Sequence, residues 1–270
     1  NQAARRAKRH YRCPVTPFYP PPTETQRTQR QLKYQTKFIK KIPSVSSVSL
    51  WETFPLCKLC GRNNYDMLVE RPPLFYRMLF PETLWRIHKR EHTVYLTFDD
   101  GPVPEVTPWV LDTLDRYGVK ATFFCVGDNV KRNPELFEEV KRRGHSVGNH
   151  TMNHMQGAKV PTRTYLRNVA MAHELIQSPL FRPPHGLLRW AQSKVLRSRY
   201  TIIMYDLVSR DYSKKLTGEQ VFENVKRFAR NGSIIVFHDS IKAQRNMQYA
   251  LPRAIEWLKK QGYNFDSIHP

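Results

Sequence analysis

Two short stretches of polar residues contain the side chains of a possible metal site. Asp99 and Asp100 directly follow the alternating stretch TVYLTF and precede a Gly-Pro pair that forces a turn. His150 and His154 are four residues apart, a spacing that brings two imidazoles to one face of a helical turn. Two histidines and one carboxylate leave coordination positions for water and substrate, as in catalytic zinc sites. Because neighbouring side chains of an extended chain point in opposite directions, one aspartate can bind metal while the other stays free as a base.

Two further groups fit acid–base chemistry. Arg182 ends an apolar stretch and precedes two prolines, which keep the chain extended, so we expect the guanidinium to be aimed at Asp99. His238 ends the apolar stretch SIIVFH, where a histidine with a carboxylate nearby is a natural general acid. Taken singly, each group also has a structural interpretation: a polar turn, surface histidines, a surface arginine or a core histidine. Their occurrence at the ends of predicted strands favours a shared site.

Strand and helix patterns alternate from Thr93 onward. The apolar patterns predict strands over 93–98, 121–126, 145–148, 180–182, 200–205, 233–238 and 263–268. Helices are predicted over 107–117, 133–144, 162–177, 189–198, 217–229 and 250–260, with Asn133 and Thr217 as N-caps. About seven βα units in roughly 200 residues fit an α/β fold with a distorted, incomplete (β/α) barrel better than an open sheet. The active site then belongs at the carboxyl ends of the strands.

Residues 1–66 differ in composition from the remainder. They contain basic, proline-rich and serine-rich stretches without a periodic apolar face, so we expect a largely unstructured N-terminal extension. An apolar, aromatic stretch begins at Met67, which we interpret as the start of a domain over 67–270 and as a candidate natural start of the protein. The stretch 67–87 is expected to pack across an open side of the barrel, with shallow insertion into a membrane interface as the alternative.

The net charge of +21 admits nucleic acid, an anionic polymer or a membrane surface as a partner. About half of this charge lies before Met67, and the remainder of the chain mixes both signs, as a solvated surface does. No apolar run reaches the roughly 18 residues that span a bilayer, and no apolar signal core is found near residue 1. This favours a cytoplasmic location.

The cysteine pattern does not indicate a disulfide framework. The chain has four cysteines, which are few and scattered for its length. Cys57 and Cys60 form a CxxC pair without a second pair nearby, so we expect no zinc site there. Cys125 falls in a predicted strand and is expected in the core, and His145 is expected to be structural.

The order of TFDDGP, HTMNH, FRPPHG, DLVSRDY and SIIVFHD resembles the five motifs of the polysaccharide deacetylase family (NodB-homology, carbohydrate esterase family four). The resemblance covers about Thr93 to Ile268 and implies a distorted βα barrel, in agreement with the strand count. It implies one divalent metal ion, usually zinc, with cobalt or nickel as further possibilities. It assigns Asp99 as catalytic base, Arg182 as the arginine that orients it, Asp211 and His238 as the acid pair, Asp100, His150 and His154 as metal ligands, and Tyr212 and Val236 as the lining of the acetyl pocket.

Three positions depart from the family pattern. His185, a candidate substrate contact, stands where the family usually has tyrosine, Tyr212 replaces tryptophan, and Val236 replaces leucine. These changes bear on substrate contacts rather than on metal binding.

The resemblance implies hydrolysis of a carbon–nitrogen bond that is not a peptide bond. We predict removal of acetyl groups from N-acetylglucosamine units of an oligo- or polysaccharide, with the acetylated glycan as partner and no nucleic acid. Two alternatives stay open. One is deacetylation of another acylated sugar or an O-acetyl ester, and the other is a non-catalytic basic protein that binds glycan or nucleic acid on the same fold.

Overall fold

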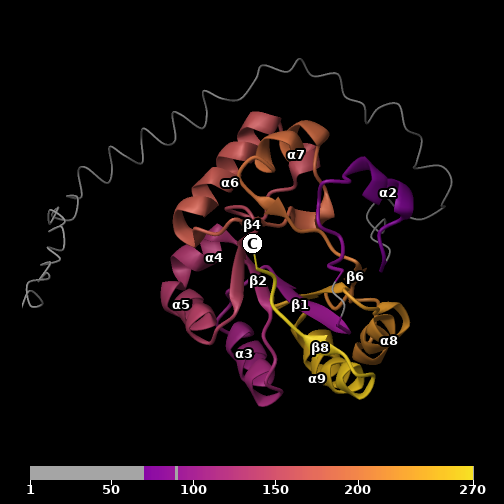
Figure 1. Cartoon of the computed structure of the whole chain (residues 1–270). Coiled ribbons are helices and arrows are strands. Elements are labelled where there is room, and N and C mark those ends of the chain that lie inside the picture. Colours follow the sequence, from indigo (N-terminus) through magenta and orange to yellow (C-terminus); the bar gives the residue numbers. More distant parts are fainter. Residues whose placement is uncertain (1–69, 89–90, 270) are drawn as a thin grey trace, which may run out of the picture. The chain divides into compact units, whose positions relative to one another are not determined.

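A computed structural model describes residues 70–88 and 91–269, in which parallel strands alternate with helices. The strands are β1 (Thr93–Asp99), β2 (Thr122–Cys125), β3 (Ser146–Asn149), β4 (Leu180–Phe181), β5 (Thr201–Ile202), β6 (Leu207–Val208), β7 (Ile234–His238) and β8 (Asn264–Phe265). They form one sheet in the order β5-β4-β3-β2-β1-β7-β6, with β8 paired to β1 (Figure 1). Every strand pair is parallel. The predicted fold class, a distorted and incomplete (β/α) barrel, is confirmed.

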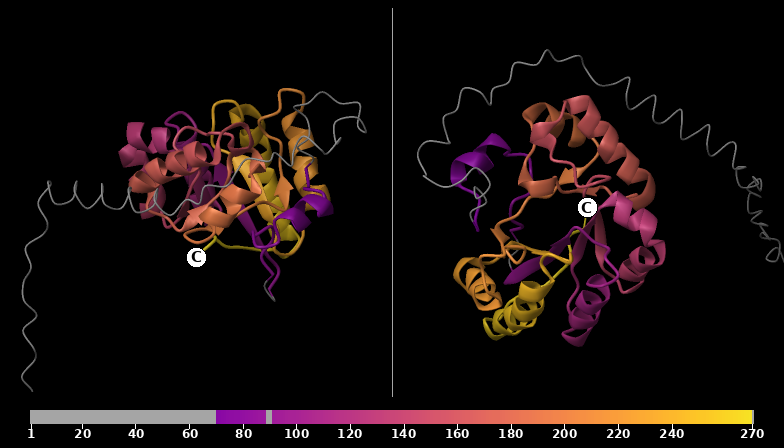
Figure 2. Two further views of the ribbon diagram at one scale, coloured as in Figure 1. Left: turned by 90° about the horizontal axis from the view of Figure 1, so that it is seen from above. Right: turned by 180° about the vertical axis from the view of Figure 1, so that it is seen from behind.

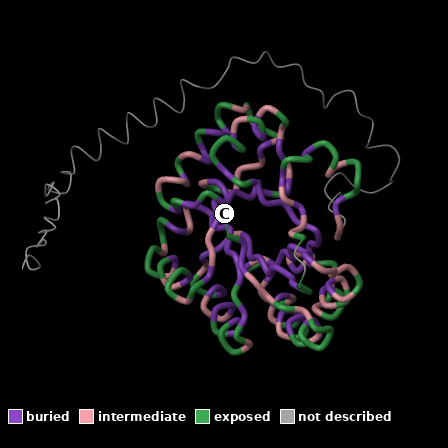
Figure 3. The backbone as a smooth tube through the Cα atoms, viewed as in Figure 1, coloured by how far each residue is buried: buried purple, intermediate pink, exposed green. Residues whose placement is uncertain are grey.

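Helices lie on the outside of the curved sheet (Figures 1 and 2). They are α2 (Leu74–Leu79), α3 (Thr107–Arg116), α4 (Gly127–Arg132), α5 (Pro134–Arg142), α6 (Thr162–Ile176), α7 (Trp190–Leu196), α8 (Gly218–Phe228) and α9 (Gln244–Lys260). The strands and the inward helix faces are buried, whereas the outward helix faces are exposed (Figure 3). Such a sheet is buried on both faces, which explains why its strands have few polar residues before their carboxyl ends.

Strand β1 is the centre of the sheet, and all seven of its residues are buried. Its register with both neighbours determines what surrounds its carboxyl end. Asp99 is the partner of Phe124 in β2 and of His238 in β7. Because the strands are parallel, the polar residues that follow them meet at one edge of the sheet.

The segment before β1 covers the side of the barrel between β5 and β7. Leu84 forms a parallel bridge to Ile203, and Arg86 forms an antiparallel bridge to Ser233. Over residues 70–87, the part of the stretch 67–87 that the structure describes, this agrees with the predicted packing across an open side. The outer face of α2 nevertheless leaves Leu74 and Met78 more than 70% exposed, at 73% and 71%.

Several predicted elements differ from the structure. Helix α4 and strand β6 were not predicted, because each is too short to show a period. Helix α9 begins at Gln244 rather than at 250 and contains Pro252 in its interior. Its buried apolar face, which extends from Met247 to Leu258, outweighs the hydrogen bond lost at the proline.

The two predicted N-caps have different outcomes. Thr217 forms the predicted capping box with Gln220. The Asn133 side chain makes no capping bond. Its amide instead donates to the carbonyl of Asn129 at 3.2 Å, because α4 directly precedes α5.

Candidate metal centre and active site

Asp99 ends β1 and is held by a buried arginine. Arg182 Nη1 donates to Asp99 Oδ1 and to Thr97 Oγ1, both at 2.7 Å. Its Nη2 donates to the Met204 carbonyl at 3.0 Å, and the guanidinium lies over the Phe124 ring at 4.0 Å. Arg182 is 1% exposed and Asp99 is 6% exposed. The carboxylate therefore has one well-defined orientation, and it needs the arginine because a buried charge without a partner is costly.

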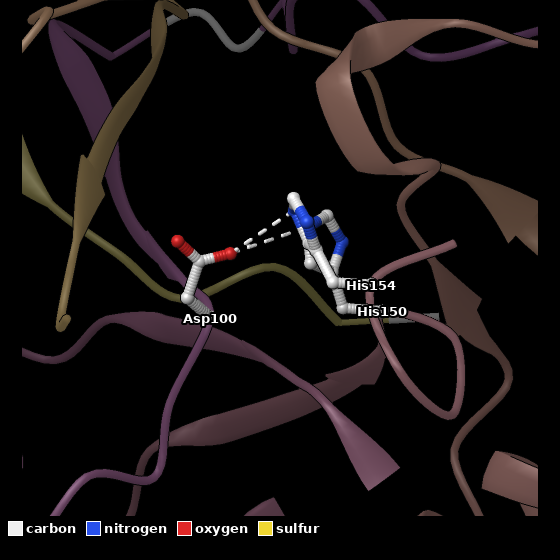
Figure 4. Close-up of side chains that lie close together, drawn as sticks. All are labelled: Asp100, His150 and His154. Atoms are coloured by element: carbon white, nitrogen blue, oxygen red, sulfur yellow. Dashed lines mark ion pairs between the residues drawn. The ribbon is translucent and has the colours of Figure 1, made fainter. Parts of the chain in front are cut away.

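Asp100, His150 and His154 come together beside Asp99 (Figure 4). One ligand atom from each lies within 4.8 Å of the others. Asp100 Oδ1 is 3.2 Å from His154 Nε2 and 3.9 Å from His150 Nε2. The distances between these side chains suit ligands arranged around one ion.

His150 is prepared for coordination by its second ring nitrogen. Nδ1 lies 2.8 Å from the Arg182 carbonyl, and since a carbonyl only accepts, Nδ1 carries the proton. Nε2 then has a lone pair that is directed at Asp100. Burial lowers the pKa of His150 to about 4, so the ring is neutral at physiological pH. This is the state that binds a metal, and the carbonyl sets the ring orientation.

The backbone conformation that brings these ligands together differs from the predicted one, which was a helical turn at 150–154 and an extended chain at Asp99 and Asp100. His150 and His154 do not lie on a helical turn; Thr151 and His154 have positive φ angles of 67° and 55°. Asp100 also has a positive φ, 87°, so it does not point away from Asp99 as it would in an extended chain. His150 Nε2 is 3.9 Å from Asp99 Oδ2 and 3.9 Å from Asp100 Oδ1. Both carboxylates therefore face the same imidazole.

The donor set fits a divalent transition-metal ion. Two imidazole nitrogens and one carboxylate oxygen are the ligands that such ions prefer in open sites. Asp100 Oδ1 is buried and makes no hydrogen bond to any described residue. Burial alone would raise the pKa of Asp100, but His238, His154 and His150 lower it, so the carboxylate is ionised. Within residues 70–88 and 91–269, this is the only group with metal-ligand geometry.

His238 lies on the other side of the aspartates and is paired with a buried carboxylate. Its Nδ1 is 2.7 Å from Asp211 Oδ1, and its backbone N–H donates to Asp211 Oδ2 at 2.7 Å. Burial by itself would lower the pKa of His238, but the Asp211 carboxylate raises it to about 9. The imidazole is therefore protonated at neutral pH and can donate a proton.

Tyr212 and Val236 lie together next to His238. The Tyr212 ring meets the His238 ring edge-on at 4.9 Å between centroids. Val236 is 2% exposed and packs with Tyr205, Val208 and Tyr212 in a small apolar cluster. An apolar cluster of this composition suits contact with a methyl group.

His185 lies in the short 3₁₀ turn Pro184–Gly186 and has a positive φ of 60°. Its ring centroid is 4.7 Å from that of His154. A cleft of about 270 Å³ adjoins His154 and Asp100 on another side and includes Asp128 and Arg132. Both features place polar groups close to the candidate metal ligands.

Two supporting residues were missed by the sequence interpretation. Asp239 Oδ1 accepts a bond from the Gly101 N–H at 3.0 Å, and its Oδ2 accepts one from Thr107 Oγ1 at 2.7 Å. Asn129 Nδ2 donates to the Asp100 carbonyl at 2.6 Å. Together they hold the turn that positions Asp100. The sequence showed that Asp239 follows a predicted strand. It did not show that this strand, β7, lies beside β1 and so brings Asp239 to the turn after Asp100.

The other predicted polar residues lie outside this site. His145 is buried and its Nδ1 accepts the backbone N–H of Ala121 at 3.2 Å, and Cys125 is a buried free thiol. Cys57 and Cys60 fall outside the described residues, as do the proposed extension 1–66 and its boundary at Met67. Among the described helices, none has the length and apolarity needed to cross a membrane.

A half-barrel of parallel strands carries three histidines and three aspartates at its carboxyl edge, a set of groups suited to metal-assisted hydrolysis. The family model described as polysaccharide deacetylase matches residues 86–201. Together with the relatives below, this match shows that the chain belongs to the polysaccharide deacetylase family.

Three relatives illustrate the similarity in sequence. A peptidoglycan-N-acetylglucosamine deacetylase of Bacillus cereus is 33% identical over 192 residues, which are 68% of this chain and 90% of that protein. PgdA of Listeria monocytogenes is also 33% identical, over 67% of this chain, but the match spans only 39% of that protein. A chitooligosaccharide deacetylase of Sinorhizobium fredii is 34% identical, over 54% of this chain and 72% of that protein.

Two solved structures illustrate the similarity in fold. A peptidoglycan N-acetylglucosamine deacetylase in complex with a substituted N-oxidanyl-benzamide has a TM-score of 0.67 at 28% identity, over 73% of this chain and 95% of that chain. A family pseudoenzyme from Bacillus anthracis has a TM-score of 0.62 at 27% identity, over 70% of this chain and 68% of that chain. A mutant of this pseudoenzyme is described as having restored enzymatic activity. This fold therefore occurs in proteins with and without enzymatic activity. The residues of the site, rather than the fold, decide whether such a protein is catalytic.

Proposed function

We propose that this protein removes acetyl groups from N-acetylglucosamine units of a glycan, with one divalent ion held by Asp100, His150 and His154. The observation that carries the proposal is the convergence of these three ligands within 4.8 Å beside a second, separately held carboxylate. Zinc is the proposed ion because it favours nitrogen and oxygen ligands with an open position, and cobalt or nickel could replace it.

A bound divalent ion would polarise the acetyl carbonyl and lower the pKa of water. Asp99 is proposed as the general base that takes a proton from the attacking water. Its orientation by Arg182 supports this role, because general-base catalysis needs a fixed carboxylate within hydrogen-bond reach. Asp100 is not proposed as the base, because its Oδ1 atom lies 3.2 Å from His154 Nε2, in the candidate metal site.

His238 is proposed as the general acid that donates a proton to the departing amine. Its pairing with Asp211 at 2.7 Å supports this role, because the carboxylate keeps the imidazole protonated at neutral pH. Tyr212 and Val236 are proposed to contact the acetyl methyl group, and His185 is proposed to contact the sugar. Acetate and a free amino sugar are the expected products.

The relatives are named for two kinds of substrate, peptidoglycan and chitooligosaccharide. Both contain N-acetylglucosamine, so this sugar is the proposed target. The non-catalytic alternative is disfavoured because each polar group of the proposed mechanism is present here, and Asp99, His150 and His238 each have a partner at 2.7–2.8 Å. An O-acetyl ester would use the same groups, and a substrate panel distinguishes it.

Acetate release and metal content, measured together, test the proposal. The wild type is expected to release acetate from chito-oligosaccharides or peptidoglycan. Asp99→Asn is expected to retain metal but to lose activity by about 10²- to 10⁴-fold, the usual contribution of a general base. His150→Ala is expected to lose the metal itself. Asp112→Asn is the control, since it removes a surface aspartate that pairs with Arg143 at 2.7 Å.

Metal content by mass spectrometry separates the two roles. Equal metal content in Asp99→Asn and His150→Ala, with acetate release kept in either, contradicts the assignment. A wild type that binds metal but releases acetate from none of the glycans contradicts the function.

A further inference from the structure

Tyr76 of helix α2 connects the segment before β1 to the loop that carries His185. Its hydroxyl donates to the Gly186 carbonyl at 2.6 Å. Burial raises the pKa of Tyr76, so the hydroxyl stays a donor at every pH at which an enzyme assay is practical. One side chain of the segment before β1 thus holds the backbone of the loop at Gly186.

The Tyr76 ring is itself held by aromatic neighbours. It meets the rings of Phe80 and Trp85 edge-on, each at 5.6 Å between centroids. Trp85 meets Tyr205 edge-on at 6.3 Å. A Cβ added to Gly186 would lie 2.7 Å from the Tyr205 ring, so the loop also touches this aromatic group directly. The hydroxyl therefore acts from a fixed position.

The stretch that Tyr76 contacts needs such support. His185 has a φ of 60° and Gly186 a φ of 65°. A left-handed backbone is strained in a residue other than glycine, so surrounding contacts must maintain it at His185. The His185 ring lies 4.7 Å from the ring of His154, measured between the ring centroids.

We propose that Tyr76 is a positioning residue for deacetylation, which holds the His185–Gly186 turn against the metal ligand His154. The proposal rests on the proposed function. Tyr76 acts through the backbone of the loop and does not touch the reacting atoms. It lies upstream of residues 86–201, which the family model matches, so this chain supports its catalytic loop with a residue from outside that match.

Tyr76→Phe tests the proposal, because it removes the hydroxyl and keeps the ring. We expect kcat to fall about fivefold to tenfold, the rate equivalent of one lost hydrogen bond to a buried carbonyl. Metal content is expected to stay close to wild type, whereas KM is expected to rise, because His185 is proposed to contact the sugar. The amides of 186–188 are expected to exchange with deuterium faster. Tyr117→Phe is the matched control, since that hydroxyl donates to Glu256 on the surface at 2.6 Å.

Three results would overturn the proposal. The first is a Tyr76→Phe enzyme with wild-type kcat and wild-type exchange at 186–188. The second is an equal loss of kcat in both tyrosine variants. The third is a loss of kcat that only follows a lower unfolding midpoint. If the wild type releases no acetate, the proposed function fails separately. Amide exchange at 186–188 then still decides whether Tyr76 holds the turn.

Discussion

His150 and His238 lie in one site but differ in protonation, because their Nδ1 atoms face different acceptors. His150 Nδ1 donates to the uncharged carbonyl of Arg182, and burial lowers its pKa to about 4. His238 Nδ1 faces the carboxylate of Asp211, which outweighs burial and raises the pKa to about 9. At the same pH, the His150 imidazole is therefore neutral and suited to bind a metal, whereas the His238 imidazole is protonated and can donate a proton. The different surroundings of the two side chains give them different roles.

The pH dependence of kcat tests this difference. His238 must be protonated to act as the acid, so kcat should stay constant from pH 7 and fall as the pH rises through about 9. In Asp211→Asn the largest of the charges that raise the pKa of His238 is lost, while burial, which lowers it, remains together with the smaller effects of Asp100 and Asp99, so the alkaline limb should move to lower pH. At pH 7 the variant should lose about tenfold or more in kcat. An alkaline limb that stays in place in Asp211→Asn contradicts the assigned pair.

At the scale of elements, the turn after β1 depends on the strand beside it. Asp239, which follows β7, accepts hydrogen bonds from Gly101 and Thr107. Its carboxylate occupies the space that a side chain at Gly101 would need: a Cβ there would lie 1.9 Å from Asp239 Oδ2. The glycine and the neighbouring strand therefore set the position of Asp100 together.

Gly101→Ala should disturb both metal binding and stability. The added methyl displaces the Asp239 carboxylate, which loses its bonds to the turn, and we expect a cost of about 2–4 kcal/mol. The control is Gly118→Ala, where φ is 61° but no atom lies within 4 Å of the added Cβ. That variant should cost only about 1–2 kcal/mol of backbone strain and bind metal normally. Denaturant unfolding and metal titration measure both effects. Equal behaviour of the two variants contradicts the role of Asp239.

At the scale of the whole molecule, the segment 70–88 completes the domain. The Glu70 carbonyl accepts the Val208 N–H at 2.8 Å, and the Glu70 carboxylate pairs with Arg210 at 2.8 Å. Arg77 pairs at 2.8 Å with Asp206, which is fully buried. Removing this segment would uncover the sheet between β5 and β7. It would also remove Arg77 from the buried Asp206 carboxylate, which would keep Arg230 at 2.6 Å and Ser233 at 2.7 Å as partners.

Two truncations test the proposed domain over 67–270. A chain that starts at Met67 is expected to keep the unfolding midpoint and acetate release of the full chain. A chain that starts at Glu91 lacks α2 and the bridges at Leu84 and Arg86, and it is expected to be inactive and to unfold at lower temperature. Circular dichroism and acetate release measure both. Loss of activity on removal of residues 1–66 would contradict the proposed boundary.

The amino-acid sequence by itself determined the fold class and the residue types of the site. Both follow from local patterns: alternating apolar stretches define parallel strands, and polar residues that follow such strands gather at one edge. For this reason Asp99, Asp100, His150, His154 and His238 could be proposed as one constellation without knowledge of the strand order.

Only the tertiary structure decided how these residues meet. The positive φ angles at Asp100, Thr151 and His154 give no signal in the sequence, because none of these residues is glycine. Asp239 and Tyr76 were missed since their partners are 138 and 110 positions away along the chain. Such contacts arise when packing brings distant elements together, and local sequence patterns carry no information about that neighbourhood.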